Sequence, residues 1–348
     1  MSTEKVLVTG ATGFLATHIV DLLLSKGYEI IGTARSEAKY KPLLNGFNMK
    51  YPEGKLTYEI VEEIGAANAF DDVLKKHGDI SHVLHTASPF AYGIGKSPEE
   101  AFKIPAVQGT RNILQAIKDY GHNVKHVVIT SSFAAITELD ESLHPVYTEK
   151  SWTSLTWDMV GDSEMLGYCC SKKLAEETAW DFVKTESPNF ALTTIIPPYM
   201  FGPQVFDFQV GKSLNLSNQM LLGVLAIDPS ETKAQKQMSG VYLDVRDAAL
   251  VHIAPLSTTT MNNKRVMAAG GKFCAQDILN AMNQTSFLKG KVAIGDPSYC
   301  DTEEYRKSLK TIDNSESIKL LGDINFNNLN NIIADTFLQY YKVNNLMD

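Results

Sequence analysis

The chain has 348 residues, of which 44% are hydrophobic and 21% are charged, with a formal net charge of -8. This length suffices for a cofactor domain and a second, smaller lobe, each with a buried core. The acidic balance gives no basic field that would attract a nucleic acid or an anionic membrane, and no apolar run approaches the roughly 20 residues that span a bilayer.

The first predicted elements are a strand, a glycine-containing turn and a helix. Residues 5–9 form a short β-branched run typical of a buried strand, and apolar residues recur at helical spacing from Leu15 to Ser25. A turn of this kind brings the amides of a helix N-terminus to a pyrophosphate. We therefore expect dinucleotide contacts from Gly10, Thr12, Gly13, Phe14 and Leu15. Because the strand starts within five residues, we expect no signal peptide and a cytoplasmic location.

The second predicted strand, residues 28–33, indicates which dinucleotide binds. Sites for NAD usually place an acidic residue after this strand, where it binds the ribose hydroxyls. Arg35 stands there instead, and Lys39 follows one helical turn later. Two cations favour the 2'-phosphate of NADPH, although solvated charges at a helix start remain an alternative.

Further strands are predicted at residues 56–61, 81–87, 125–130 and 191–196, with a helix from about 98 to 120. Strands that alternate with helices predict a doubly wound α/β domain with a parallel sheet. Ligands of such sheets bind at the carboxyl ends of the strands. The residues that follow these strands, and that we expect at the cofactor, are Ala87, Ser88, Thr130 and Pro198.

Tyr168 and Lys172 form a Tyr-x-x-x-Lys element, which places both side chains on one face of a helix, one turn apart. The lysine ammonium can then favour the phenolate form of the tyrosine, which makes the phenol a usable proton donor or acceptor. The pattern alone is common by chance. Ser132, after the strand at 125–130, adds a hydroxyl that can orient a carbonyl oxygen.

The regular alternation fades beyond Pro203, and the polar stretch from 204 to about 241 predicts a smaller lobe over the site. We divide the chain into a cofactor domain, 1–198 with returning segments near 241–257, and a mainly substrate-binding region, 199–348. A helix is expected from Asp244, and another at about 329–341. The four cysteines form no C-x-x-C pair, and we expect no metal site.

These motifs together resemble the extended short-chain dehydrogenase/reductase superfamily, a Rossmann-fold family. Shorter strings resemble its fungal NADPH-dependent methylglyoxal, 3-methylbutanal and ketone reductases and, more distantly, plant dihydroflavonol reductases. The strings are Ile31-Gly32-Thr33-Ala34-Arg35-Ser36, His85-Thr86-Ala87-Ser88-Pro89-Phe90, Ser171-Lys172-Lys173-Leu174-Ala175-Glu176 and Tyr199-Met200-Phe201-Gly202-Pro203-Gln204. The resemblance implies Ser132, Tyr168 and Lys172 as catalytic residues. Gln108 replaces an asparagine of many relatives, so a water relay there stays open.

The resemblance implies an oxidoreductase that reduces aldehydes and ketones with NADPH, with Tyr168 as proton donor and Lys172 also holding the nicotinamide ribose. Loops that the fold directs to the nicotinamide carry an apolar set that we expect to line the substrate pocket, although each aromatic taken alone is more often a core residue: Phe90, Phe133, Met165 and Tyr199. A nucleotide-sugar epimerase or dehydratase, and a non-catalytic NADP-sensing regulator, share the fold and remain alternatives. The physiological substrate, the stereochemical preference and the oligomeric state stay open.

Overall fold

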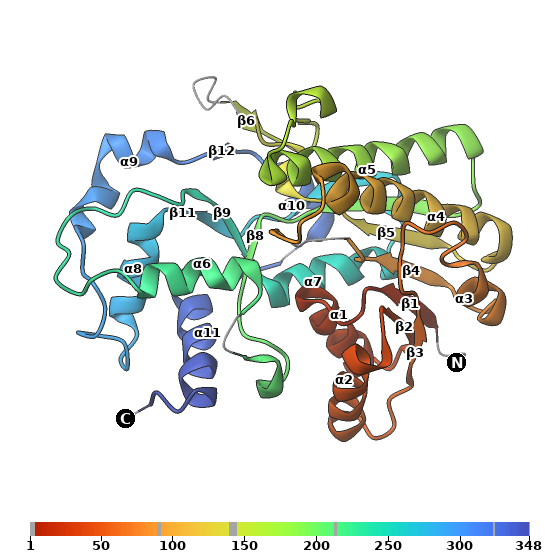
Figure 1. The fold of residues 1–348 in the computed structure, drawn as a ribbon, viewed down its shortest axis with the longest axis horizontal. Helices are drawn as coiled ribbons and strands as arrows, with labels where there is room; N and C mark the ends of the chain where they lie inside the picture. The colour runs from red at the N-terminus through yellow and green to blue at the C-terminus, as the bar shows by residue number, and fades with distance from the viewer. Residues whose placement is uncertain (1–3, 89–91, 139–144, 212–213, 323, 348) are drawn as a thin grey trace.

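The computed structural model describes residues 4–88, 92–138, 145–211, 214–322 and 324–347 (Figure 1). Its centre is a seven-stranded sheet in the order β10-β7-β5-β4-β1-β2-β3, and every neighbouring pair is parallel. The predicted doubly wound Rossmann sheet is confirmed. Its strands are β1 (Lys5–Thr9), β2 (Glu29–Ala34), β3 (Leu56–Ile60), β4 (His82–His85), β5 (His126–Thr130), β7 (Ala191–Ile196) and β10 (Lys264–Met267).

Helices cover both faces of this sheet (Figure 1). Successive residues of a strand point to opposite faces, so in β1 Val6 and Val8 pack into one core layer and Leu7 into the other. Both layers are apolar, which explains why β1 reads as a continuous hydrophobic run. One layer contains α1 (Phe14–Ser25), α2 (Glu37–Lys50) and α7 (Val245–Ile253), and the other contains α3 (Asp71–Lys76), α4 (Ile104–Tyr120) and α5 (Glu164–Glu186).

The strand order reverses between β1 and β4. From β1 the chain moves outward to β2 and β3, and it then returns to β4 on the other side of β1. Loops that leave the carboxyl ends of these two strands therefore diverge and leave a crevice between them. This reversal places the glycine turn after β1 beside the segment that follows β4.

The helix predicted at 98–120 is divided in two. A π-helical turn, η1 (Glu99–Lys103), precedes α4, which begins at Ile104. Pro105 stands in the first turn of α4, and its missing amide interrupts the regular hydrogen-bond pattern where the two segments join.

A smaller lobe lies beside the main sheet, on the left of Figure 1. Its core gathers around the buried rings of Phe201, Phe273 and Phe337. It contains a three-stranded sheet and three long helices: β8 (Tyr199–Phe201), β9 (Gly240–Asp244), β11 (Gly271–Phe273), α6 (Leu216–Leu225), α8 (Ala275–Gln284) and α11 (Leu329–Val343). Shorter elements are β6 (Val146–Tyr147), β12 (Thr311–Ile312), α9 (Glu303–Ser308) and α10 (Ser315–Leu321).

Two segments from the C-terminal half return to the main sheet. The helix predicted from Asp244 is α7, where the Asp244 carboxylate accepts a hydrogen bond from the Arg246 amide at 2.7 Å. The strand β10, which pairs with β7, was not predicted, because Lys264-Arg265-Val266-Met267 is short and half polar. The division of the chain at residue 198 stays a proposal.

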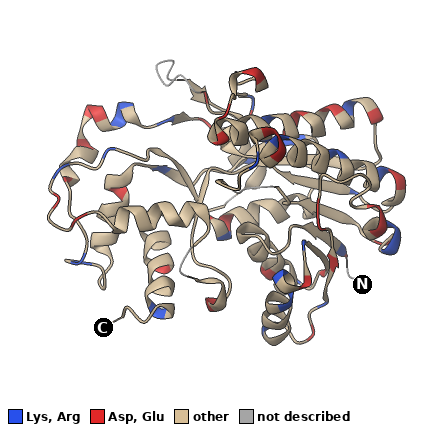
Figure 2. Ribbon diagram, in the orientation of Figure 1, with Lys and Arg blue, Asp and Glu red and all other residues tan. Residues whose placement is uncertain are grey.

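Acidic and basic residues are interspersed along the outer helices (Figure 2). No helix within the described ranges combines the length and the apolarity needed to cross a membrane.

Candidate active site

The turn after β1 has the shape that a pyrophosphate requires. Gly10 has a φ of +64°, and a Cβ added there would lie 2.9 Å from the Cα of Ala87. The Gly13 amide donates to the Gly10 carbonyl at 3.0 Å, and Gly13 caps α1 without a side-chain hydrogen bond. The first-turn amides, including those of Phe14 and Leu15, therefore have no acceptor within the helix and fit an anionic group.

The end of β2 presents two cations. Arg35 follows β2 directly, and Lys39 lies in the first turn of α2; both side chains are exposed. Within the described part of the chain neither side chain forms an ion pair, whereas Lys41 on the same helix pairs with Glu37 at 3.1 Å. Both cations thus remain available for a phosphate near the crevice.

The remaining predicted cofactor residues surround the same crevice. Thr12 and Ser88 are half-buried, at the glycine turn and after β4. Pro198 is buried after β7. Ala87 is held against β1 because its amide donates to the Thr9 hydroxyl at 3.1 Å.

The three predicted catalytic residues meet at the carboxyl end of β5. Ser132 begins the short helix η2 (Phe133–Ala135), where its hydroxyl accepts a hydrogen bond from the Ala134 amide at 3.1 Å. The same hydroxyl lies close enough to the phenol of Tyr168 on α5 to favour its ionised form. One turn later on α5, the Lys172 ammonium donates to the Thr130 carbonyl at 2.8 Å.

The protonation of the trio differs from the expectation that Lys172 lowers the pKa of Tyr168. Burial dominates and raises the pKa of Tyr168 to about 12, and the nearby Ser132 hydroxyl opposes this rise because it favours the phenolate. Burial also lowers the pKa of Lys172 to about 8, opposed by the carboxylate of Glu176. At neutral pH the tyrosine is therefore protonated and the lysine is mostly charged.

A buried histidine supports the trio from α7. The ring Nδ1 of His252 donates to the Ala248 carbonyl at 2.7 Å, which leaves Nε2 to accept from the Thr130 hydroxyl at 3.0 Å. Burial lowers the pKa of His252 to about 4, helped slightly by the Lys172 charge and opposed by the Ala248 hydrogen bond. The imidazole is neutral at pH 7.

This burial predicts a loss of stability in acid. The folded-state pKa of His252 lies below its unfolded value, so its contribution is complete above about pH 6.5 and is lost as pH falls toward 4. We expect the free energy of unfolding to fall between pH 7 and pH 5 by about 2 kcal/mol more in the wild type than in His252→Gln. Urea unfolding at both pH values measures this difference. The exposed His122→Gln is the control, and an equal acid loss in the wild type and His252→Gln would contradict the expectation.

A small cavity lies behind Lys172. His85, Thr110 and Glu176 line it together with the ammonium, and its volume of about 10 Å³ is enough for about one water molecule. Gln108, considered for a water relay, has an exposed side chain on α4 and does not line this cavity.

The predicted substrate residues occupy different environments. Tyr199 on β8 is 44% exposed and Met165 on α5 is 61% exposed. Phe133 is only 8% exposed and packs against Tyr147 in a core cluster, which leaves it little surface to offer a substrate. Phe90 lies outside the described residues.

Three side chains beside Tyr168 were not predicted as site residues: Tyr92, Cys169 and Phe102, whose ring lies 6.2 Å from that of Tyr168. The ring of Tyr92 lies 6.3 Å from that of Tyr168, and Cys169 is close enough that a thiolate there would raise the pKa of Tyr168. Tyr92 follows the predicted loop residue Phe90 by two positions, and Cys169 is four residues after Met165 on one helix face. These two spacings are the sequence signals that could have identified Tyr92 and Cys169.

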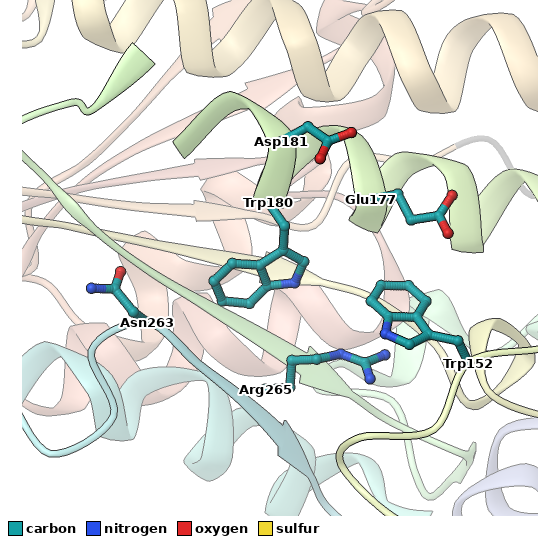
Figure 3. Close-up of a pocket in the computed structure, with 6 residues that line it drawn as sticks. All are labelled: Trp152, Glu177, Trp180, Asp181, Asn263 and Arg265. Atoms are coloured by element: carbon teal, nitrogen blue, oxygen red, sulfur yellow. The ribbon is translucent and has the colours of Figure 1, made fainter. Parts of the chain in front are cut away.

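A further pocket lies away from this site (Figure 3). It measures about 560 Å³ and is lined by residues of α5 and by residues at or near β10, namely Trp152, Glu177, Trp180, Asp181, Asn263 and Arg265. None of the predicted site residues lines it. The Arg265 guanidinium lies 3.8 Å from the centre of the Trp152 ring.

Comparison with known proteins places this site in context. The model of the NAD dependent epimerase/dehydratase family matches residues 6–270. The NADPH-dependent methylglyoxal reductase of Saccharomyces cerevisiae is 40% identical over 347 residues, 97% of this chain and 98% of the relative. A putative NADPH-dependent methylglyoxal reductase of Candida albicans is 39% identical over 325 residues, 92% of this chain and 94% of the relative.

Solved structures agree with these matches. The yeast methylglyoxal/isovaleraldehyde reductase in complex with NADPH superposes with a TM-score of 0.89 at 38% identity, over 98% of this chain and 99% of the other. A Candida albicans structure with NADPH also has a TM-score of 0.89, at 39% identity over the same shares.

Proposed function

This chain belongs to the NAD dependent epimerase/dehydratase family, and within it we propose an NADPH-dependent reductase of aldehydes and ketones. The observation that carries this function is the meeting of Ser132, Tyr168 and Lys172 at the carboxyl end of β5, beside the glycine turn. Near full-length relatives that bear the name of NADPH-dependent methylglyoxal reductases support the same reaction.

The chain's own residues supply positioning and the proton. Ser132 holds the carbonyl oxygen, and Tyr168, protonated at neutral pH, donates its hydroxyl proton to that oxygen. Lys172 binds the ribose hydroxyls while it anchors to the Thr130 carbonyl. When bound, NADPH supplies the hydride that reaches the carbonyl carbon.

The cofactor contacts proposed for this chain follow the crevice. The amides of the glycine turn and the first turn of α1 hold the pyrophosphate, and the exposed Arg35 and Lys39 hold the 2'-phosphate. The absence of ion-pair partners for both cations among the described residues supports NADPH over NADH.

The two alternative functions fit the site less well. Sugar dehydration generally needs extra acid or base carboxylates near the serine, and η2 after Ser132 consists of Phe133, Ala134 and Ala135. A non-catalytic sensor does not require a tyrosine beside a serine hydroxyl, one helical turn from a charged lysine.

Consumption of NADPH with a panel of aldehydes and ketones, together with product analysis after incubation with nucleotide sugars, tests the function. We expect turnover with small or hydrophobic carbonyl compounds and none with nucleotide sugars. Turnover of nucleotide sugars alone would favour the epimerase or dehydratase, and no turnover with either class would favour the sensor.

Three further features are proposed. Residues 199–348 mainly form the substrate lobe over the main domain. Met165 and Tyr199 form an apolar substrate wall, with Tyr92 beside Tyr168. In the sequence prediction, Phe90 and Phe133 also belong to this wall. The compartment is the cytoplasm, which four free cysteines support.

The substrate wall predicts a shift in selectivity. Truncation of Met165 or Tyr199 to Ala should favour bulkier ketones, because steric sorting of this kind is worth about 1 to 3 kcal/mol. The ratio of kcat/KM for a bulky and a small ketone measures the shift, with chiral analysis of the alcohol. Met49→Ala, at an 84% exposed position at the end of α2, is the control. Unchanged ratios in both variants would place the pocket elsewhere.

A further inference from the structure

Glu176 is a fully buried carboxylate on α5 that none of the catalytic steps above uses. The Arg265 guanidinium donates to both of its oxygens, at 2.8 and 3.1 Å. The hydroxyls of Thr194 on β7 and Ser131 after β5 add hydrogen bonds at 2.7 and 2.5 Å, and the Trp180 indole donates at 3.2 Å. Although burial opposes the charge, these bonds hold the pKa of Glu176 below its ordinary value, so it stays ionised.

The carboxylate is bound where it can act on the catalytic residues. Glu176 lies one helical turn after Lys172, which itself lies one turn after Tyr168, so the three share one face of α5. Lys172 and Glu176 line the same small cavity. Ser131, which Glu176 accepts from, is the residue directly before Ser132.

Arg265 fixes the carboxylate from the edge of the sheet. Its other terminal nitrogen donates to the carbonyls of Glu149 and Ser151, at 2.6 and 2.8 Å. Figure 3 shows the Arg265 side chain near the indoles of Trp152 and Trp180, and all three side chains line the same pocket. Hydrogen bonds thus tie the ion pair to β10, β7 and the end of β5.

The other titratable groups that face Lys172 carry no charge at neutral pH. Burial lowers the pKa values of His85 on β4 and His252 on α7 to about 3 and about 4, and repulsion from the Lys172 charge acts in the same direction. Tyr168 on α5 is protonated. Among the described residues, Glu176 is thus the carboxylate whose charge supports the ammonium.

We propose that Glu176, oriented by Arg265, is a positioning residue for carbonyl reduction: it balances the buried ammonium of Lys172 and fixes Ser131, and through it the catalytic Ser132. The expected effect on the kinetics of carbonyl reduction rests on the proposed function. The expected effect on the pKa of Lys172 does not depend on it. Loss of the carboxylate charge leaves the ammonium buried without a counter-charge, so Lys172 loses its proton at lower pH.

The direct test follows the proton of Lys172 by NMR. Protein labelled with ¹³C at the lysine Cε is titrated, and the Lys172 signal is assigned by its disappearance in Lys172→Met. We expect Glu176→Gln to lower the pKa of Lys172 by about one unit or more, as removal of a close opposite charge does. The alkaline limb of the kcat/KM profile for carbonyl reduction should move to lower pH by the same amount.

Controls separate this effect from a general loss of structure. Glu177→Gln removes the neighbouring carboxylate, which lines the surface pocket, and should shift neither curve. Glu176→Gln leaves the buried Arg265 without its ion-pair partner, which can impair folding. The double variant Glu176→Gln/Arg265→Gln removes both charges. It should also lower the pKa of Lys172.

The outcomes are distinct. An unchanged pKa of Lys172 in both Glu176 variants would overturn the inference. A lowered pKa without any movement of the alkaline limb would overturn the role in the reaction. A wild-type protein that reduces no carbonyl compound would refute the proposed function, while the NMR titration would still decide whether Glu176 supports Lys172.

Discussion

Replacement of Tyr168 by Phe is expected to lower kcat for carbonyl reduction by about 10² to 10⁴, the usual contribution of a general acid. The variant loses only the phenolic hydroxyl that lies beside Ser132. NADPH affinity, measured by fluorescence titration, should stay nearly unchanged, because Lys172 keeps its bond to the Thr130 carbonyl.

Tyr120→Phe provides the matched control. Tyr120 is the last residue of α4, and the chain continues from it to the amino end of β5. Tyr120 therefore lies toward the amino ends of the strands, whereas Ser132 lies at their carboxyl ends. If Tyr168→Phe kept more than about a tenth of the wild-type turnover while chemistry was rate-limiting, Tyr168 would not be the proton donor.

Replacement of Arg35 by Ala should raise the KM for NADPH and barely change that for NADH. A charged hydrogen bond to the 2'-phosphate is worth about 1.5 to 3 kcal/mol, which corresponds to roughly 10- to 150-fold. Steady-state kinetics with each cofactor measure the two constants.

Lys41→Ala tests whether any lost cation on α2 has this effect. Lys41 forms an ion pair with Glu37, so we expect Lys41→Ala to leave the KM values for NADPH and NADH unchanged. Equal increases of both constants in Arg35→Ala would show that Arg35 does not recognise the 2'-phosphate.

The main elements of the fold and of the site follow from local patterns in the sequence. The run at Val6 predicts a buried strand, and the helical spacing of Tyr168 and Lys172 predicts that they share a face, because both depend only on neighbouring residues. The positions of Gly10 and Ser132 follow from the rule that ligands bind at the carboxyl ends of parallel strands. Their roles in binding and catalysis remain proposals.

Other features depend on contacts between distant parts of the chain. Arg265 meets Glu176 across 89 residues, and β10, which carries it, has too few apolar residues to be recognised as a strand. The raised pKa of Tyr168 likewise comes from burial by the folded structure, which helical spacing does not reveal. Phe133 has the loop position of a substrate contact, but tertiary packing against Tyr147 buries it.

The most direct measurement follows a labelled hydride. NADPH that carries deuterium at the transferred position is incubated with the wild-type protein and a hydrophobic aldehyde, and the product is analysed by mass spectrometry and NMR. We predict an alcohol with deuterium on its carbinol carbon, formed at a much lower rate by Tyr168→Phe. Persistence of intact NADPH and aldehyde across the carbonyl panel, or an alcohol without deuterium, would contradict direct NADPH-dependent carbonyl reduction by this chain.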